Sequence, residues 1–321
     1  MEQRNIEQID HKNGVNKILV GWIIFFIIER QKILKRKQAG QTPYTEDPIF
    51  NEYRFCNVDR EDDRVTTWIR DNIRVPYADH KDLWLMLALA RWINWPPTLA
   101  ELVESKYWFG KPDFSLQGLA DVMLERQKRG EKIYTGSYMI RAESDKNSPF
   151  IDKTKHEFVC LKVIGQLVED RERIEAVLNK PDCTLQEFNH LITSYVNWGG
   201  FMSYELVTDL NHTRYLENAS DRYTWLNPGP GFVRGANRLM GLPLNGNLSE
   251  KASNEYALQV IEHAHKLYDE GVIPNDLIDK SQIDMRCIES AHCEMDKYLR
   301  VLTGEGKPRA KFHSHEQYYN I

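Results

Sequence analysis

Residues 184–210 read TLQEFNHLITSYVNWGGFMSYELVTDL and contain two helical patterns separated by paired glycines. The first pattern opens with the Thr-x-x-Glu spacing of a capping box, which predicts a helix over about 184–196. The second pattern predicts a helix over 201–211, directly after Gly199 and Gly200. Glycine lets the backbone approach a ligand closely, and the first N–H groups of a helix attract phosphate. The stretch therefore predicts a helical hairpin whose second helix offers a seat for an anion.

The rest of the chain is also expected to be helical, which makes the fold class all-α. Only Lys132–Arg141 has a strand-like pattern, with a loop that contacts another group as the alternative. The Asn-, Gly- and Pro-rich region 212–250 is expected to be a long functional loop. We expect one helical domain over 15–312, with flexible ends at 1–14 and 313–321. Further helices are expected at about 15–38, 80–92, 115–128, 154–178, 253–270 and 281–302. One more is expected from a cap at Asp62 or Asp63 through Arg74, and a short one after Pro96-Pro97-Thr98, with Glu101 in its first turn.

Composition limits the class of protein. The chain has 321 residues and a net charge of −5, so it does not bind nucleic acid by bulk charge, and a nucleic-acid site must be a local basic surface. Its strongest apolar run, Ile18–Ile28, has eleven residues. A bilayer span needs about 20, so this run predicts a buried core helix and no membrane segment. The five cysteines are expected to be reduced thiols, because no export signal is apparent.

A hairpin of this kind is typical of the helix-hairpin-helix by which glycosylase-type proteins hold a DNA backbone; a plain tight turn is the alternative. In such glycosylases the catalytic aspartate follows the hairpin glycine by about twenty residues, which is the position of Asp221. Asp209 lies nearer, one helical turn after Glu205. The loop that follows contains Gly229 and Gly231, and its amides and two arginines suit an anion.

Several motifs in order resemble the phage and bacterial alpha-glutamyl/putrescinyl thymine pyrophosphorylases, also called amino acid:DNA transferases. The same domain occurs as the helical part of some 5-hydroxymethyluracil (5-hmdU) DNA kinases. The resemblance covers about residues 20–312. The stretches that carry it are QTPYTEDPIF from Gln41, YRFCNVDREDD from Tyr53, YTGSYM from Tyr134, YELVTDL from Tyr204, NPGPG from Asn227 with RGANR from Arg234, and CEMDKY from Cys293.

This resemblance implies a DNA-glycosylase-like fold that modifies a flipped base. The expected reaction displaces pyrophosphate from 5-(pyrophosphoryloxymethyl)deoxyuridine in double-stranded phage DNA, using an amino acid or polyamine. A 5-hmdU DNA kinase acts in the preceding step, and the expected location is the cytoplasm of the infected bacterium. We expect neither PLP nor ATP as cofactor; a divalent ion bridging pyrophosphate to a carboxylate is compatible chemistry without a supporting ligand spacing.

The candidate residues have distinct expected roles. The base toward the incoming nucleophile is Asp209 or Asp221, with Glu205 beside them. DNA and phosphate contacts are expected from Gly199, Gly200, Gly229, Gly231, Arg234, Arg238 and Lys297. Further motif residues are Tyr53, Arg54, Asn57, Arg60, Asp63, Tyr138, Glu294, Asp296 and Tyr298. No metal ligand is predicted, and structural ion pairs are the alternative for the charged members. Lys307, Arg309 and Lys311 form a basic tail suited to nonspecific DNA contact.

Three other functions stay open or are disfavoured. A monofunctional glycosylase using Asp221 is one; a bifunctional one needs a lysine near the hairpin, and none occurs between Lys180 and Lys251. A noncatalytic DNA-binding partner of the kinase is another. The kinase itself is disfavoured, because a phosphate-binding loop ending at Gly306-Lys307 lacks its first glycine.

Overall fold

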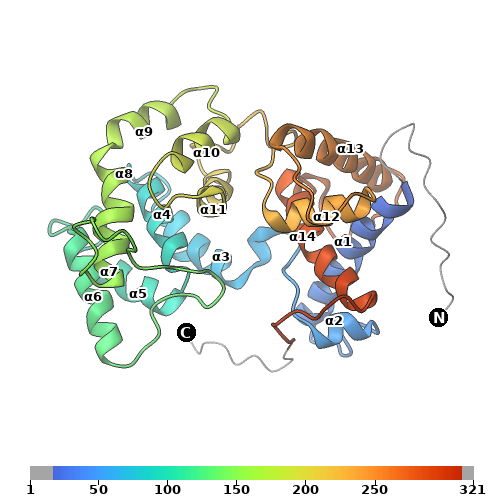
Figure 1. Ribbon diagram of the computed structural model, residues 1–321, viewed down its shortest axis with the longest axis horizontal. Helices are drawn as coiled ribbons and strands as arrows, with labels where there is room; N and C mark the ends of the chain where they lie inside the picture. The colour runs from blue at the N-terminus through green and yellow to red at the C-terminus, as the bar shows by residue number, and fades with distance from the viewer. Residues whose placement is uncertain (1–16, 313–321) are drawn as a thin grey trace. The chain divides into compact units, whose positions relative to one another are not determined.

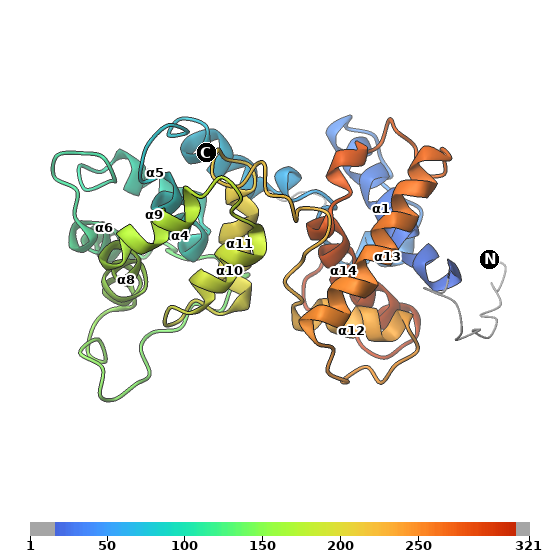
Figure 2. The same cartoon turned by 90° about the horizontal axis from the view of Figure 1, so that it is seen from above.

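A computed structural model describes residues 17–312, and the described chain is all-α, as predicted. Its internal contacts divide it into two compact units. The first unit contains the described residues up to Arg60 and those from Arg222 onward, so it is built from both ends of the chain. The second unit is the continuous segment Glu61–Asp221. Figures 1 and 2 show the helices of each unit.

The first unit is organised around the last long helix. Its helices are α1 (Lys17–Gln38), α2 (Pro48–Glu52), α12 (Pro230–Leu239), α13 (Glu250–Asp269) and α14 (Met285–Leu302), with a 3₁₀ turn at Lys280–Gln282. Helices α1, α12 and α13 all pack against α14 (Figure 2). One face of the apolar run in α1 is buried, with Ile23 and Ile27 fully inaccessible, so the predicted core helix is confirmed.

The second unit is built around α4 (Leu83–Ile93), whose eleven residues are all buried. This agrees with the apolar pattern all round that helix. The others are α3 (Arg64–Ile69), α5 (Pro96–Glu104), α6 (Leu116–Lys128), α7 (Lys155–Glu157), α8 (Gly165–Glu169), α9 (Arg171–Leu178), α10 (Leu185–Thr193) and α11 (Gly200–Leu210). A 3₁₀ turn covers Arg60–Asp62, and π-helical segments cover Arg70–Arg74 and Phe158–Ile164.

The structure corrects the sequence-based expectations in three places. Lys132–Arg141 forms no strand and is an irregular segment. The helix expected over 154–178 is interrupted by the π-helical segment and by a break at Asp170. The region 212–250 is not a continuous loop, because it contains α12. That helix begins favourably, with Gly229 as its N-cap residue and Pro230 in its first turn.

The glycines of α12 allow close helix packing. A Cβ atom on Gly231 would overlap with the Cys293 side chain, and one on Gly235 would overlap with the backbone carbonyl of His292. Both neighbours lie on α14, so the two helices approach more closely than larger residues permit. Glycine here fits a contact surface rather than a flexible loop.

The predicted flexible ends, 1–14 and 313–321, lie outside the described residues. Whether 15–312 is one domain stays a prediction. Within the described part of the chain, no helix combines the length and apolar character needed to cross a bilayer.

Candidate functional site

The predicted hairpin is present between α10 and α11. Its turn places Asn197 in the left-handed region, at φ 67°, whereas Gly199 has φ −71°. The turn therefore does not require glycine at Gly199 for its backbone angle. A Cβ atom there would also meet nothing within 4 Å, so open space lies beside the start of α11. Phe201 in the first turn is 55% exposed, which leaves an apolar ring on the same turn.

Asp209 on α11 is held in a buried ion pair with Arg91 of α4. The Arg91 Nε and one terminal nitrogen each donate to a different Asp209 oxygen at 2.5 Å, and the two side chains are 0% and 1% exposed. Arg91 donates further to Thr66 and Asn94. Both carboxylate oxygens of Asp209, one of the two candidate bases, thus already accept charge-assisted hydrogen bonds.

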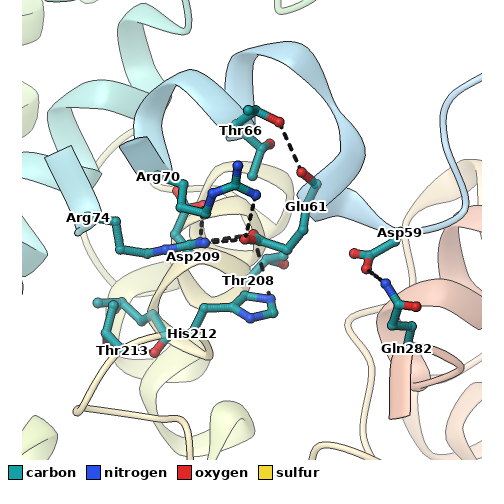
Figure 3. A network of polar contacts seen from close by, with 12 residues as sticks. Asp59, Glu61, Thr66, Arg70, Arg74, Thr208, Asp209, His212, Thr213 and Gln282 are labelled. Carbon is teal, nitrogen blue, oxygen red and sulfur yellow. Dashed lines mark hydrogen bonds and ion pairs between the residues drawn. The ribbon is translucent and has the colours of Figure 1, made fainter. Parts of the chain in front are cut away.

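A second carboxylate, Glu61, lies near Asp209, and Arg74 contacts both (Figure 3). Arg74 donates to both of its oxygens and lies 3.9 Å from Asp209. His212 Nε2 lies 3.8 Å from Glu61, and Arg70 lies 3.9 Å from it. Burial alone favours the neutral acid, but the hydrogen bonds from Arg74 and the nearby positive charges lower the pKa of Glu61 below its usual value. The cluster is a charged network in the second unit.

Glu205 and Asp221, which were predicted at or beside the catalytic base, also have hydrogen-bond partners. Glu205 is 2% exposed and accepts a hydrogen bond of 2.8 Å from the Tyr138 hydroxyl, which joins two predicted motif residues. The Tyr138 ring also packs edge-on against Phe201. Asp221 accepts from the backbone N–H groups of Leu185 and Gln186 at 2.8 and 2.9 Å. Asp221 therefore fixes the start of α10, where a negative charge is favourable.

The predicted anion site on α12 is an ion-pair cluster in the first unit. Asp296, 4% exposed, accepts a hydrogen bond of 2.9 Å from the Arg238 Nε atom, and its ion pairs with Arg234 and Arg300 measure 3.2 and 3.3 Å. Arg238 also donates two hydrogen bonds of 2.7 Å to Glu305, whose pKa these bonds lower to about 2. Three guanidinium groups thus face two carboxylates. Gly229 and Gly231 lie at the start of the same helix.

A second group of predicted residues meets on α14. Glu294 accepts a hydrogen bond of 3.0 Å from the Cys56 N–H and forms an ion pair of 2.6 Å with Lys297. Burial disfavours the charged form of Lys297, but Glu294 outweighs it and raises the pKa of Lys297. The Tyr298 hydroxyl donates to Asp47, which caps α2.

The remaining motif residues flank this group or lie elsewhere. Tyr53 is 1% exposed, and Asn57 accepts a hydrogen bond from Arg30. Arg60 ends the first unit, whereas Asp63 is the N-cap residue of α3 in the second. The structure therefore brings the segment 53–57 to α14 but divides the full motif between the two units.

The end of the basic tail is paired with the segment that follows α2 in the first unit. Segment 310–312 pairs with 52–54 through hydrogen bonds of 3.1 and 3.0 Å, and Phe312 lies under the ammonium of Lys37. We call the resulting set of exposed cations the α1–tail patch. Its members are Lys35, Lys37, Arg54, Lys307 and Arg309. Lys311 is paired with Glu52 and is not counted in it.

Within residues 17–312, no group of three or more His, Cys, Asp or Glu side chains is arranged to hold a metal ion. Sequence reasoning missed Arg91, Arg74, Glu61 and His212. The signal for Arg91 was available, because a single charge in a helix that is apolar all round requires a buried partner. No signal in the sequence identifies Asp209 as that partner, since the two are 118 positions apart.

The described chain is thus all-α, with a helical hairpin and a buried arginine–carboxylate cluster in its second unit. The profile of a family described as "5-hmdU DNA kinase, helical domain" matches residues 18–307, and the chain belongs to that family. A "5-hmdU DNA kinase" of Bacillus phage SP10 is 24% identical over 304 residues, which cover 88% of this chain. The chain spans about half of that relative, 46% of its length. No solved structure matches the chain significantly.

Proposed function

We propose that this chain takes part in thymine hypermodification in phage DNA. We propose further that it displaces pyrophosphate from 5-(pyrophosphoryloxymethyl)deoxyuridine, using an amine or hydroxyl group of an amino acid or polyamine. Membership of the 5-hmdU DNA kinase helical-domain family supports the pathway. The observation that carries the reaction is the pair Arg234 and Arg238, which the buried Asp296 holds together on α12. Paired guanidinium groups suit a departing pyrophosphate.

The reaction makes four demands on the protein. The base must leave the stack, the DNA backbone must be held, the nucleophile must lose a proton, and the leaving group must be neutralised. The donor nitrogen or oxygen gives its proton to the base and forms a bond to the 5-methylene carbon, while the carbon–oxygen bond breaks and pyrophosphate leaves with its electron pair. The open space beside Gly199 and the N-terminus of α11 support a contact with the DNA backbone, because a DNA phosphate can approach the protein backbone there.

Three groups of the second unit are candidates for the base. Asp209 and Asp221 retain that role as predictions, although Arg91 and the start of α10 already engage their carboxylates. His212 is a third candidate. Its imidazole is 27% exposed and lies beside Glu61, and imidazole is the side chain that ordinarily titrates nearest to neutral pH.

Two alternatives make different chemical predictions. A glycosylase that uses Asp221 releases free base from hydroxymethyluracil DNA. A noncatalytic partner binds DNA but alters no nucleoside, which is compatible with a chain that matches less than half of a kinase-named relative. We expect no ATP hydrolysis by this chain, because Val301 occupies the first glycine position of the nearest phosphate-loop pattern.

The test is incubation of the purified chain with pyrophosphorylated hydroxymethyluracil DNA and a panel of amino acids and polyamines. Mass spectrometry of the digested nucleosides reports the adduct, and a phosphate assay reports released pyrophosphate. We expect an adduct with one class of donor and its loss in Arg238→Gln. Free base in place of an adduct supports the glycosylase, and absence of any product with every donor contradicts the transferase.

A further inference from the structure

The guanidinium groups of Arg234 and Arg238 on α12 are oriented by the buried Asp296 of α14. The Arg238 Nε atom donates a hydrogen bond of 2.9 Å to Asp296, and the Arg234 Nε atom lies 3.2 Å from Asp296 in an ion pair; the Asp296 side chain is 4% exposed. Arg234 and Arg238 lie four positions apart, so they share one face of α12. Because Asp296 accepts from the Arg238 Nε atom, the terminal nitrogens of Arg238 point the other way. Those nitrogens carry the paired N–H groups that bind carboxylate or phosphate in two-point fashion.

The group on that open side is Glu305, which belongs to the same chain. Both Glu305 oxygens accept from Arg238 at 2.7 Å, and Arg234 lies 3.8 Å away. The Thr303 hydroxyl donates a third hydrogen bond of 2.9 Å to Glu305. A carboxylate in this position has the contacts expected of one face of a phosphate group. Unlike Asp296, Glu305 is exposed to solvent, so another anion can compete for its place.

The turn that carries Glu305 follows directly after α14. Gly304 in this turn has φ +74°. The backbone of the turn is held in place, because the Gly304 N–H donates to the Val301 carbonyl and the Gly306 N–H donates to the Arg300 carbonyl, both at 3.2 Å. The Glu305 side chain is exposed, so rotation about its own torsions moves the carboxylate away while Asp296 keeps the arginines in place.

From these contacts we propose that Arg234 and Arg238 form a polyphosphate site that Glu305 of the same chain occupies until a polyphosphate displaces it. The ligand class is a pyrophosphate group, free or ester-linked, because it carries more charge and more acceptor oxygens than one carboxylate. The inference rests on the proposed function for its biological use. The binding step itself requires neither DNA nor a donor.

Removing the competing carboxylate must then tighten the binding of a free anion. A tethered group competes at an effective concentration in the millimolar range. In Glu305→Gln the arginines stay aligned by Asp296 but lose their charged partner. We expect the Kd for inorganic pyrophosphate to fall by about tenfold or more, and to rise again with added salt.

The experiment is calorimetric titration of the full chain with inorganic pyrophosphate. The matched control is Glu255→Gln on α13. It makes the same change in charge at an exposed ion pair with Lys251, which is separate in sequence from Arg234, Arg238 and Glu305. We expect tighter binding only in Glu305→Gln, and its loss in Glu305→Gln/Arg238→Gln. A rise in melting temperature with added pyrophosphate gives a second measure for any variant of reduced stability.

Equal affinity in the wild type, Glu305→Gln and Glu255→Gln overturns the proposal, as does a complete lack of binding. An equal gain in both single variants also overturns it, because general charge then explains the effect. These outcomes are separate from the transferase assay. A chain that binds pyrophosphate as described and modifies no DNA contradicts only the proposed reaction.

Discussion

The buried pair Arg91–Asp209 makes a quantitative prediction about Asp209→Asn. That change leaves a guanidinium with 0% exposure without its charged partner, while Thr66 and Asn94 stay in contact with it. Breaking a buried ion pair by removing one member costs about 3–5 kcal/mol, because the other charge is left uncompensated. For a chain of this size the melting temperature should fall on the order of 10 °C.

Urea and thermal unfolding, followed by far-ultraviolet circular dichroism, measure this cost. The exposed pair Lys251–Glu255, with a separation of 3.9 Å, is the control, and Glu255→Gln should change stability by less than about 0.5 kcal/mol. The double change Arg91→Met/Asp209→Leu should recover most of the loss, since it removes both charges. If Asp209→Asn unfolds like the wild type and yet loses DNA modification, Asp209 acts in the chemistry and the structural interpretation is wrong.

Three further outcomes follow from packing, protonation and charge. Gly235→Ala should destabilise the chain by about 1–3 kcal/mol through overlap with α14, whereas Gly21→Ala, exposed on α1, should be neutral or stabilising; equal thermal shifts would contradict the packing argument. Burial lowers the pKa of His292 to about 4, so stability should fall by about 3 kcal/mol as the pH falls from about 6.5 to 4, because the unfolded chain takes up the proton first. His292→Gln should flatten that dependence in urea titrations, and an unchanged slope would refute it. Replacing the five cations of the α1–tail patch with serine should reduce the salt slope of DNA binding by about 0.9 for each DNA phosphate that the protein no longer neutralises, and an unchanged slope in fluorescence anisotropy would exclude the patch.

The sequence was most informative where periodicity and burial agree. The apolar pattern of α4 and the run in α1 identified core helices, because hydrophobic burial follows local pattern. The hairpin between α10 and α11 was also predicted. Its left-handed residue was not, since Asn197 rather than a glycine takes that conformation.

The sequence was least informative where long-range contact decides the role of a residue. Gly231 and Gly235 looked like loop residues, yet both lie in α12. Glycine is required at each position because α14 occupies the space that a side chain would need. Asp209 was predicted as a candidate base, with an ion pair as the alternative, and Arg91 lies against it in the fold. Spacing along a chain carries no information about a partner far away in sequence.

The two-ended construction of the first unit has a consequence for synthesis on the ribosome. Glu61–Asp221 is continuous and emerges complete, so it can fold while translation proceeds. Helix α1 emerges before the other described helices, but α14, which packs against it, is made some 250 residues later. The apolar face of α1 therefore stays exposed to water while most of the polypeptide chain is synthesised. At about 5–20 residues per second that wait lasts roughly 10–50 s, long enough for a chaperone to bind α1 before α14 arrives.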